Sequence, residues 1–294
     1  MIYIKLILSA LFSGFIVVGG RMIAGEVPPY SAMFIRFAVA SLLMFLLLWK
    51  RQELRLIKQL SKTQWAAFLG LALSGVIGFN LFMLLGLETV PAARAGVTYG
   101  LFPLLTWVAA WLVLREKFTR WSLLGSIVCL GGVLLALSLG SLEFVKNLVP
   151  ASGDLWLYVS LVCWVTYSLI TTWLLRRLNA IFVTALTCII ALLLLFPMAM
   201  GEGLGAVASG LEARAWLVFI VQGVLSTTLA FLWYCEGMGK LGAGKATLFL
   251  NIMPLGTVFM AAAILGEPLY LAQILGAGLV ILGVWLAGRN KLQG

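Results

Sequence analysis

Histidine is absent from this sequence of 294 residues, and aspartate occurs only at Asp154. Without histidine, Ser-His and Cys-His nucleophilic pairs cannot form, and histidine-bound metals are excluded. With one aspartate, no pair of membrane aspartates can form. These absences argue against an intramembrane enzyme, and we expect no catalytic residue, no cofactor and no metal site.

Charge of either sign is also scarce. Charged residues make up 10% of the chain and hydrophobic residues 63%, with a mean hydropathy of +1.11, whereas globular proteins carry roughly 25% charged residues. A membrane helix needs roughly 20 apolar residues, so about ten spans would use nearly the whole chain. The sequence predicts an all-α polytopic membrane protein with no soluble catalytic domain.

Apolar runs between charged residues, glycines and prolines define the expected spans. The first run is longer than the apolar part of a secretory signal and no A-x-A site follows it, so we expect a retained helix. The expected spans are 3–24, 30–49, 64–87, 92–114, 121–139, 154–175, 180–200, 214–236, 243–265 and 270–288.

The cysteines carry no sign of disulfide or metal chemistry. All lie inside expected spans and none forms a C-x-x-C pair, so we expect small core residues. They are Cys129, Cys163, Cys188 and Cys235.

Lysine and arginine are concentrated in alternate loops, which predicts the orientation because basic loops resist translocation. Both termini should be cytoplasmic, and the net charge of +10 should reflect the anionic leaflet, with no nucleic-acid partner. The basic set contains Lys5, Lys50, Arg51, Arg55, Lys58, Lys62, Arg115, Lys117, Arg120, Arg176, Arg177, Lys240, Lys245, Arg289 and Lys291, and the opposite set contains Arg21, Arg94, Lys146 and Arg214.

The sequence matches itself at a step of 151 residues. Five expected spans separate the copies, so the second copy must cross the membrane in the opposite sense, as an inverted repeat. We therefore expect ten helices as two inverted five-helix repeats, 1–139 and 154–294, joined by a linker at 140–153. The matches include Ala95 with Ala246, Pro103 with Pro254, Thr106 with Thr257, Glu116 with Glu267, Gly125 with Gly276 and Gly132 with Gly283.

These residues resemble a known family. The stretch LGAGKATLFLNIMPLGTVFMAAAILGEPLYLAQILGAGLVILGVWLAG, residues 241–288, is similar to the closing segment of EamA-type members of the drug/metabolite transporter superfamily, and residues 90–137 resemble the same module. The resemblance implies that helices 1, 3, 4, 6, 8 and 9 surround a central cavity, with helices 5 and 10 more peripheral.

Two departures from the family pattern stand in helix 1. Phe12 replaces a frequent tryptophan, and the helix has no acidic residue. The second departure weighs against proton-coupled export of cationic drugs.

Two prolines are the candidates for bending helices. Pro103 and Pro254 occupy equivalent places in the two repeats, and proline in a membrane helix frees a carbonyl and bends the rod. We expect them to shape the cavity wall; the alternative is packing around Gly96-x-x-x-Gly100.

Arg36 is a basic residue well inside an expected span. Burying its charge costs a few kcal/mol unless it pairs or snorkels. It is a candidate to hold a substrate carboxylate, and a structural salt bridge or a snorkelled head group is an equal alternative.

Amides and aromatic side chains supply the other candidate substrate contacts. Polar groups at membrane depth should face the bundle interior, and deep aromatic residues suit an amphipathic ligand. Hydrogen bonds between helices and core packing are the respective alternatives. The candidates are Asn80, Tyr99, Trp164, Tyr167, Trp233 and Asn251.

The glutamates fall near helix ends. We expect Glu116 and Glu267 to be structural, at the cytoplasmic and outer faces. Glu88 and Glu236 are the candidates for proton coupling, because they would border the vestibules.

Taken together, the sequence predicts a secondary transporter in a bacterial inner membrane. The resemblance implies export of an amino acid or related metabolite by alternating access. The expected partners are a small-molecule substrate and membrane lipids, and the expected state is a monomer or weak homodimer. A pore-type facilitator is the alternative.

Overall fold

The computed structural model describes residues 1–23, 25–116, 119–141, 143 and 152–288. The described residues are mostly helical and contain no β-strand. Most of the expected linker, including Lys146, lies outside the described residues, as do Lys117, Arg289 and Lys291.

Ten helices in the described part of the chain are long and apolar enough to cross a membrane, which confirms the predicted class. Short helices η1 (Glu53–Gln59) and α11 (Leu204–Gly210) lie between spans and were not predicted. The spans are α1 (Ile2–Met22), α2 (Pro29–Lys50), Lys62–Leu87, Arg94–Leu114, α7 (Arg120–Ser138), α9 (Ser152–Leu174), α10 (Ala180–Gly201), Ala213–Leu241, Ala243–Leu265 and α16 (Leu271–Gly288).

Four of these spans are built from shorter helices. The third comprises α3 (Lys62–Leu71), η2 (Ala72–Gly78) and α4 (Phe79–Leu87), and the fourth comprises α5 (Ala92–Tyr99) and α6 (Phe102–Leu114). The eighth comprises α12 (Ala213–Val221), η3 (Gln222–Leu229) and α13 (Ala230–Leu241), and the ninth comprises α14 (Ala243–Leu248), η4 (Phe249–Asn251) and α15 (Ile252–Leu265).

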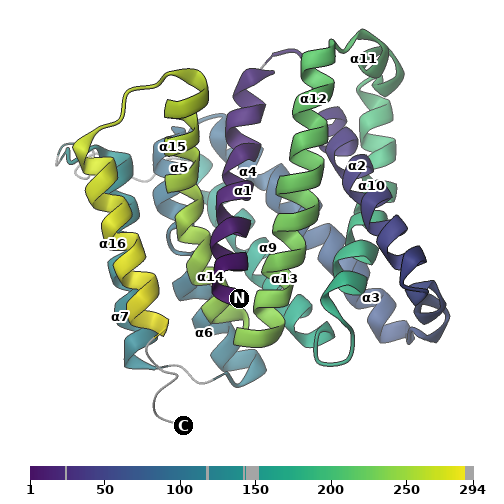
Figure 1. The fold of residues 1–294 in the computed structure, drawn as a ribbon, viewed down its shortest axis with the longest axis horizontal. Coiled ribbons are helices and arrows are strands. Elements are labelled where there is room, and N and C mark those ends of the chain that lie inside the picture. Colours follow the sequence, from purple (N-terminus) through teal and green to yellow (C-terminus); the bar gives the residue numbers. More distant parts are fainter. Residues whose placement is uncertain (24, 117–118, 142, 144–151, 289–294) are drawn as a thin grey trace.

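The bundle has two ends that the repeats occupy in opposite senses. α1 begins and α16 ends at one end, here called the terminal end, and α6 also ends there (Figure 1). α15, the counterpart of α6, ends at the other end, here called the distal end (Figure 1). Equivalent segments thus point in opposite directions, as the 151-residue step predicts.

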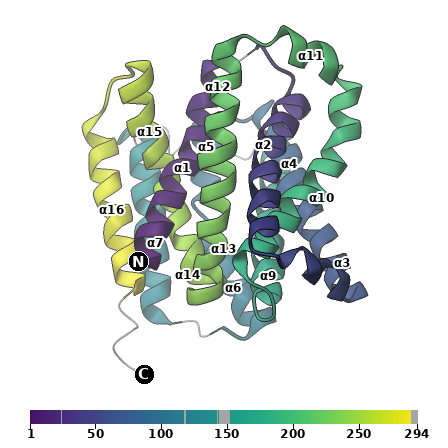
Figure 2. The ribbon, with the colours of Figure 1, turned by 45° about the vertical axis from the view of Figure 1, so that its right-hand side comes forward.

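A pseudo-two-fold axis passes between α7 and α16, which lie together at one edge of the bundle (Figure 2). A Cβ added to Gly125 would lie 2.5 Å from the Gly283 carbonyl oxygen, and one added to Gly276 would lie 2.5 Å from that of Gly132. These two contacts are one contact used twice, because Gly276 and Gly283 are Gly125 and Gly132 displaced by 151 residues. Glycine is required because the two backbones touch.

The thiol of Cys129 marks where the axis crosses this helix pair. Its Sγ lies 3.4 Å from the carbonyl oxygen of Val280, 151 residues away, so the position meets its own counterpart. Cys129, Cys188 and Cys235 are buried free thiols, and Cys163 is half-buried.

The spans at the interface between the repeats also pack as equivalent pairs. Leu157 of α9 lies on Gly86 of α4, and its counterpart Leu6 of α1 lies on Gly237 of α13. An added Cβ would meet these leucines at 2.5 and 2.4 Å, respectively. The first helix of each repeat therefore packs against the other repeat in the same way.

Equivalent irregularities interrupt the spans. The third and eighth spans each contain a π-helical segment, η2 and η3, and these overlap when displaced by 151 residues. The fourth span breaks at Gly100 and Leu101, and the ninth changes to a 3-10 turn at η4. The interruptions of the fourth and ninth spans each directly precede a helix that carries Pro103 or Pro254 in its first turn. Such breaks mark ligand sites in transporters.

Candidate functional site

A cavity of about 250 Å³ lies between the first, second, third and eighth spans, toward the distal end. It reaches the protein surface beside Gly20, Gly25 and Pro29, which line it and are exposed. Arg36, Asn80 and Gln222 supply polar groups to its wall, and most of the rest is apolar.

Arg36 lies about two turns into α2 and is buried, with 7% of its surface exposed. Its Nε has no hydrogen-bond partner, and no ion pair found among the described residues includes it. The guanidinium carbon lies 5.3 Å from the centre of the Phe37 ring. Among the described residues, the structural salt bridge that the sequence left open is therefore not found.

Two amides complete the polar part of the cavity wall. Gln222 opens the π-helical segment η3, and its Nε2 donates to the carbonyl of Ile16 at 3.1 Å. Asn80 follows the other π-helical segment, and its Nδ2 donates to the carbonyl of Val76 at 2.7 Å. Each amide nitrogen carries a second N–H, which these two contacts do not use.

Three predicted site residues gather in an aromatic cluster. Trp164 lies 5.2 Å from Tyr167 and 5.0 Å from Phe79, measured between ring centres. Tyr99 stacks on Phe102 at 5.0 Å, and its hydroxyl lies 2.9 Å from Ser160 Oγ. These rings pack against one another and do not line the cavity around Arg36.

The last two predicted contacts neither line the cavity nor share a ring contact with Trp164, Tyr167 or Tyr99 in the described residues. Trp233 stacks on Phe12 with ring centres 5.7 Å apart. Asn251 is buried in the break of the ninth span, and its Nδ2 has no hydrogen-bond partner. Of the seven residues predicted to bind substrate, the structure thus brings Arg36 and Asn80 together in the cavity.

Gln222 was missed by sequence reasoning. The available signal was an amide inside an apolar span, the same signal that singled out Asn80 and Asn251. Its neighbour Gly223 is packed against Val39 of α2, where an added Cβ would lie 2.6 Å from the valine Cβ. This close approach holds the start of η3 beside α2.

The two proton-coupling candidates lie at opposite ends. Glu236 accepts a hydrogen bond from Lys5 Nζ at 2.6 Å at the terminal end. Glu88 is exposed just after α4, toward the distal end. Neither lines the cavity.

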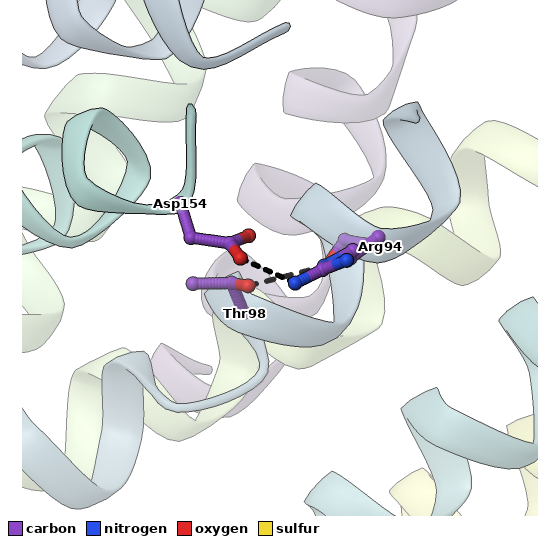
Figure 3. A network of polar contacts seen from close by, with 3 residues as sticks. All are labelled: Arg94, Thr98 and Asp154. Atoms are coloured by element: carbon purple, nitrogen blue, oxygen red, sulfur yellow. Dashed lines mark hydrogen bonds and ion pairs between the residues drawn. The ribbon is translucent and has the colours of Figure 1, made fainter. Parts of the chain in front are cut away.

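An ion pair that the sequence did not predict joins the fourth span to the sixth. Arg94 of α5 donates to Asp154 of α9, and Thr98 donates to the Arg94 carbonyl at 3.2 Å (Figure 3). The Arg94 and Asp154 side chains are 15% and 6% exposed. This pair fixes the start of α5 to the start of α9.

The described residues show no group of side chains suited to binding a metal ion. They contain no cluster of three or more His, Cys, Asp or Glu side chains that would hold an ion.

The described spans form an inverted repeat of apolar helices, with π-helical segments at equivalent places next to the cavity that Arg36, Asn80 and Gln222 line. This is the architecture of membrane transporters built from inverted repeats. The chain belongs to the EamA-like transporter family, whose model matches residues 1–138 and again 151–289. The two matches agree with the repeat seen in the structure.

Relatives in bacteria and archaea are similar over most of the chain. The uncharacterized transporter YyaM of Bacillus subtilis is 29% identical over 97% of this chain and 93% of its own. An uncharacterized transporter of Archaeoglobus fulgidus is 25% identical over 98% and 99%. The uncharacterized inner membrane transporter YhbE of Escherichia coli is 23% identical over 86% and 78%.

A solved crystal structure shares the fold. Its TM-score is 0.79 at 17% identity, and the match covers 100% of this chain and 99% of the other.

Proposed function

We propose that the protein is a secondary transporter that exports a small organic metabolite, an amino acid or related compound, by alternating access. The observation that supports this proposal is a difference between the two ends of the bundle. The repeats supply equivalent residues to both ends. At the terminal end a carboxylate joins the fourth span to the ninth, whereas in the described residues of the distal end the equivalent carboxylate pairs with an arginine of the first span.

At the terminal end, the fourth and ninth spans are locked together. The Glu116 carboxylate accepts hydrogen bonds from the backbone N–H groups of Ala243 at 3.0 Å and Gly244 at 3.4 Å, at the start of α14. Trp107 of α6 packs on Gly244, where an added Cβ would lie 2.3 Å from the indole ring. A carboxylate at a helix N-terminus satisfies free N–H groups and is favoured by the helix dipole.

At the distal end, the equivalent carboxylate has a different partner. Glu267 accepts a hydrogen bond from Arg21 at 2.7 Å, and both side chains are about half exposed, at 48% and 50%. The backbone positions equivalent to Ala243 and Gly244 are residues 92 and 93 at the start of α5. No hydrogen bond joins Glu267 to that helix start in the described part of the chain.

Exchange of these contacts gives the second state of the cycle. Glu267 would then accept from the start of α5, and Glu116 would release α14. A helix cap contributes roughly 0.5–2 kcal/mol, so exchanging one cap for its counterpart leaves the two states close in free energy. Near-equal states are what a transporter needs to alternate.

The basic loops support a cytoplasmic terminal end. Lys50 ends α2 and Arg176 follows α9 at this end, and the opposite loops carry few basic residues. With this orientation the protein lies in a bacterial inner membrane with both termini inside, and the cavity faces outward. We propose a monomer or weak homodimer as the transporting unit.

Exchange down a gradient is the coupling that the cavity favours, because none of the described residues that line it is acidic. Proton antiport through Glu88 or Glu236 is the alternative. A pH jump across vesicles separates the two: exchange predicts the same flux for wild type, Glu88→Gln and Glu236→Gln, and antiport predicts that one variant loses its response to pH.

Flux into proteoliposomes tests the transport function. The purified chain should take up components of a radiolabelled amino-acid mixture with saturation, and the same unlabelled amino acid inside should accelerate uptake. Flux that rises linearly with concentration and ignores the opposite side would instead identify a pore. Absence of flux above empty vesicles for amino acids and for isovalerate would overturn the proposal.

A further inference from the structure

The cavity wall carries one unbalanced charge. Of the residues that the structure describes in this wall, Arg36 alone is ionic. A buried cation without a partner is costly in a membrane and usually marks a functional site. No hydrogen bond or ion pair of the Arg36 guanidinium is found among the described residues, so an anionic ligand in the cavity would supply the missing counter-charge.

We propose that Arg36 binds the carboxylate of the transported compound, and that the substrates are small carboxylates with an apolar body. This inference rests on the proposed transport function and deepens it by naming the ligand chemistry. Guanidinium and carboxylate groups match in planar, two-bond geometry.

The neighbouring amides suit the same ligand. Gln222 and Asn80 each use one amide N–H to hold a backbone carbonyl and keep a second N–H. Both line the cavity together with Arg36. The site therefore offers donors from three spans, and its described lining contains no carboxylate that would repel an anion.

The remainder of the cavity selects for size and apolarity. Met33, Met83 and Phe219 contribute apolar surface. The volume of about 250 Å³ corresponds to roughly eight water molecules at about 30 Å³ each. A compact aliphatic acid fits this space, whereas a drug-sized molecule needs about 300–1,000 Å³.

Two sources share this chemistry: a simple aliphatic acid and an amino acid with an apolar side chain. Three probes with one branched skeleton distinguish them. Isovalerate has the carboxylate alone, L-valine has both charged groups, and isobutylamine has the amine alone.

The test is thermal unfolding of the detergent-solubilised full chain with each probe, because a ligand that binds the folded state raises its stability. We expect isovalerate, L-valine or both to raise the unfolding temperature with saturation, and isobutylamine to leave it unchanged. The acid that gives the larger shift shows whether the site prefers a simple aliphatic acid or an amino acid with an apolar side chain. No shift with either acid, or a shift with the amine alone, overturns the proposal.

Variants at the cavity separate binding from structure. Arg36→Met should abolish the acid-induced shift and leave the ligand-free unfolding temperature unchanged or higher, because it removes an unpaired buried charge. Arg36→Lys should keep the shift with an apparent Kd at least tenfold weaker. Arg51→Gln, at an exposed arginine directly after α2, is the control and should keep the wild-type response.

The contrary outcomes are distinct. A ligand-free unfolding temperature that falls by several degrees in Arg36→Met, or failure of that variant to fold, would show a structural role and overturn the proposal. An undiminished acid shift in Arg36→Met would do the same. Saturable flux of a compound without a carboxylate, with no acid-induced shift, would leave the transport function standing and remove this inference. Acid binding without any flux would do the reverse.

Discussion

The two repeats differ in an informative way between the axis of the bundle and its ends. At the axis, Gly125 on Gly283 and Gly132 on Gly276 are equivalent contacts of the same closeness. At the ends, Glu116 caps a helix and its counterpart Glu267 holds an arginine. Contacts that obey the symmetry are common to both repeats, whereas under the proposed exchange the contacts that break it distinguish the two states.

The repeats also differ in the residues at the position of Arg36, which lines the cavity. Arg36 has Thr187 as its counterpart, and the Thr187 hydroxyl is buried and donates to the carbonyl of Val183 at 2.8 Å. The group that we propose to bind the carboxylate therefore comes from one repeat alone. The packing contacts at the axis are duplicated, but this arginine is not.

The ion pairs give the largest expected difference between the ends. Asp154→Asn leaves Arg94 without its charged partner at a site where both side chains are largely buried, so we expect a loss of about 3–5 kcal/mol in the free energy of unfolding. Glu236→Gln, at the more exposed Lys5 pair, should cost about 1 kcal/mol.

Denaturant unfolding in the same detergent measures both variants. Equal losses for Asp154→Asn and Glu236→Gln would contradict the expectation that the more buried ion pair contributes more to the free energy of unfolding.

The axis contact predicts equal effects in the two repeats. Gly276→Ala and Gly125→Ala both place a methyl group against backbone, so each should lower the free energy of unfolding by about 1–3 kcal/mol. Gly278→Ala, whose added Cβ would meet no atom within 4 Å, is the matched control and should not be destabilised. Markedly unequal costs at Gly125 and Gly276 would argue against the axis.

The helix cap predicts a shift in population. Glu116→Gln weakens the contact to α14, which should disfavour the present state by about 1–2 kcal/mol and lower its population relative to the other by roughly 5–30-fold. A cysteine at Met83, in the cavity, should then react more slowly with an impermeant maleimide in a background without the four native cysteines. An unchanged or faster rate would count against the cap as a lock.

The smallest effect is expected at Glu267, the counterpart of Glu116. Glu267→Gln breaks only a half-exposed pair with Arg21, so it should change the free energy of unfolding by less than about 1 kcal/mol. The Met83 cysteine should react at least as fast as in the parent, because the state in which Glu267 would cap α5 is disfavoured. A slower reaction would show that Glu267 already stabilises the present state.

Much of the fold followed from the sequence because apolar length and charge placement are local signals. The ten spans agree with the expected ranges to within a few residues, except that the eighth extends to Leu241. The helix interruptions at η2 and η3 were not predicted. They depend on contacts with other spans, such as Gln222 with Ile16, which no local pattern encodes.

The site was less predictable for the same reason. A buried arginine and amide were visible as polar residues in apolar runs, but their meeting in one cavity depends on how α2 and α4 are spaced. The Glu116 carboxylate was expected to be structural, yet its acceptor role at α14 joins residues 127 positions apart. The aromatic candidates were grouped by span depth, which does not tell cavity lining from ring packing.

The most direct test of the exchange between ends is a pair of spin-label distances in the full chain. One pair, Val113 with Lys240, reports the terminal end, and its equivalents Thr89 and Ile264 report the distal end. We predict a shorter distance at the terminal pair in the parent, and in Glu116→Gln a new longer component there with a new shorter component at the distal pair. Equal distances at both ends, or changes in the same direction at both, would contradict the account.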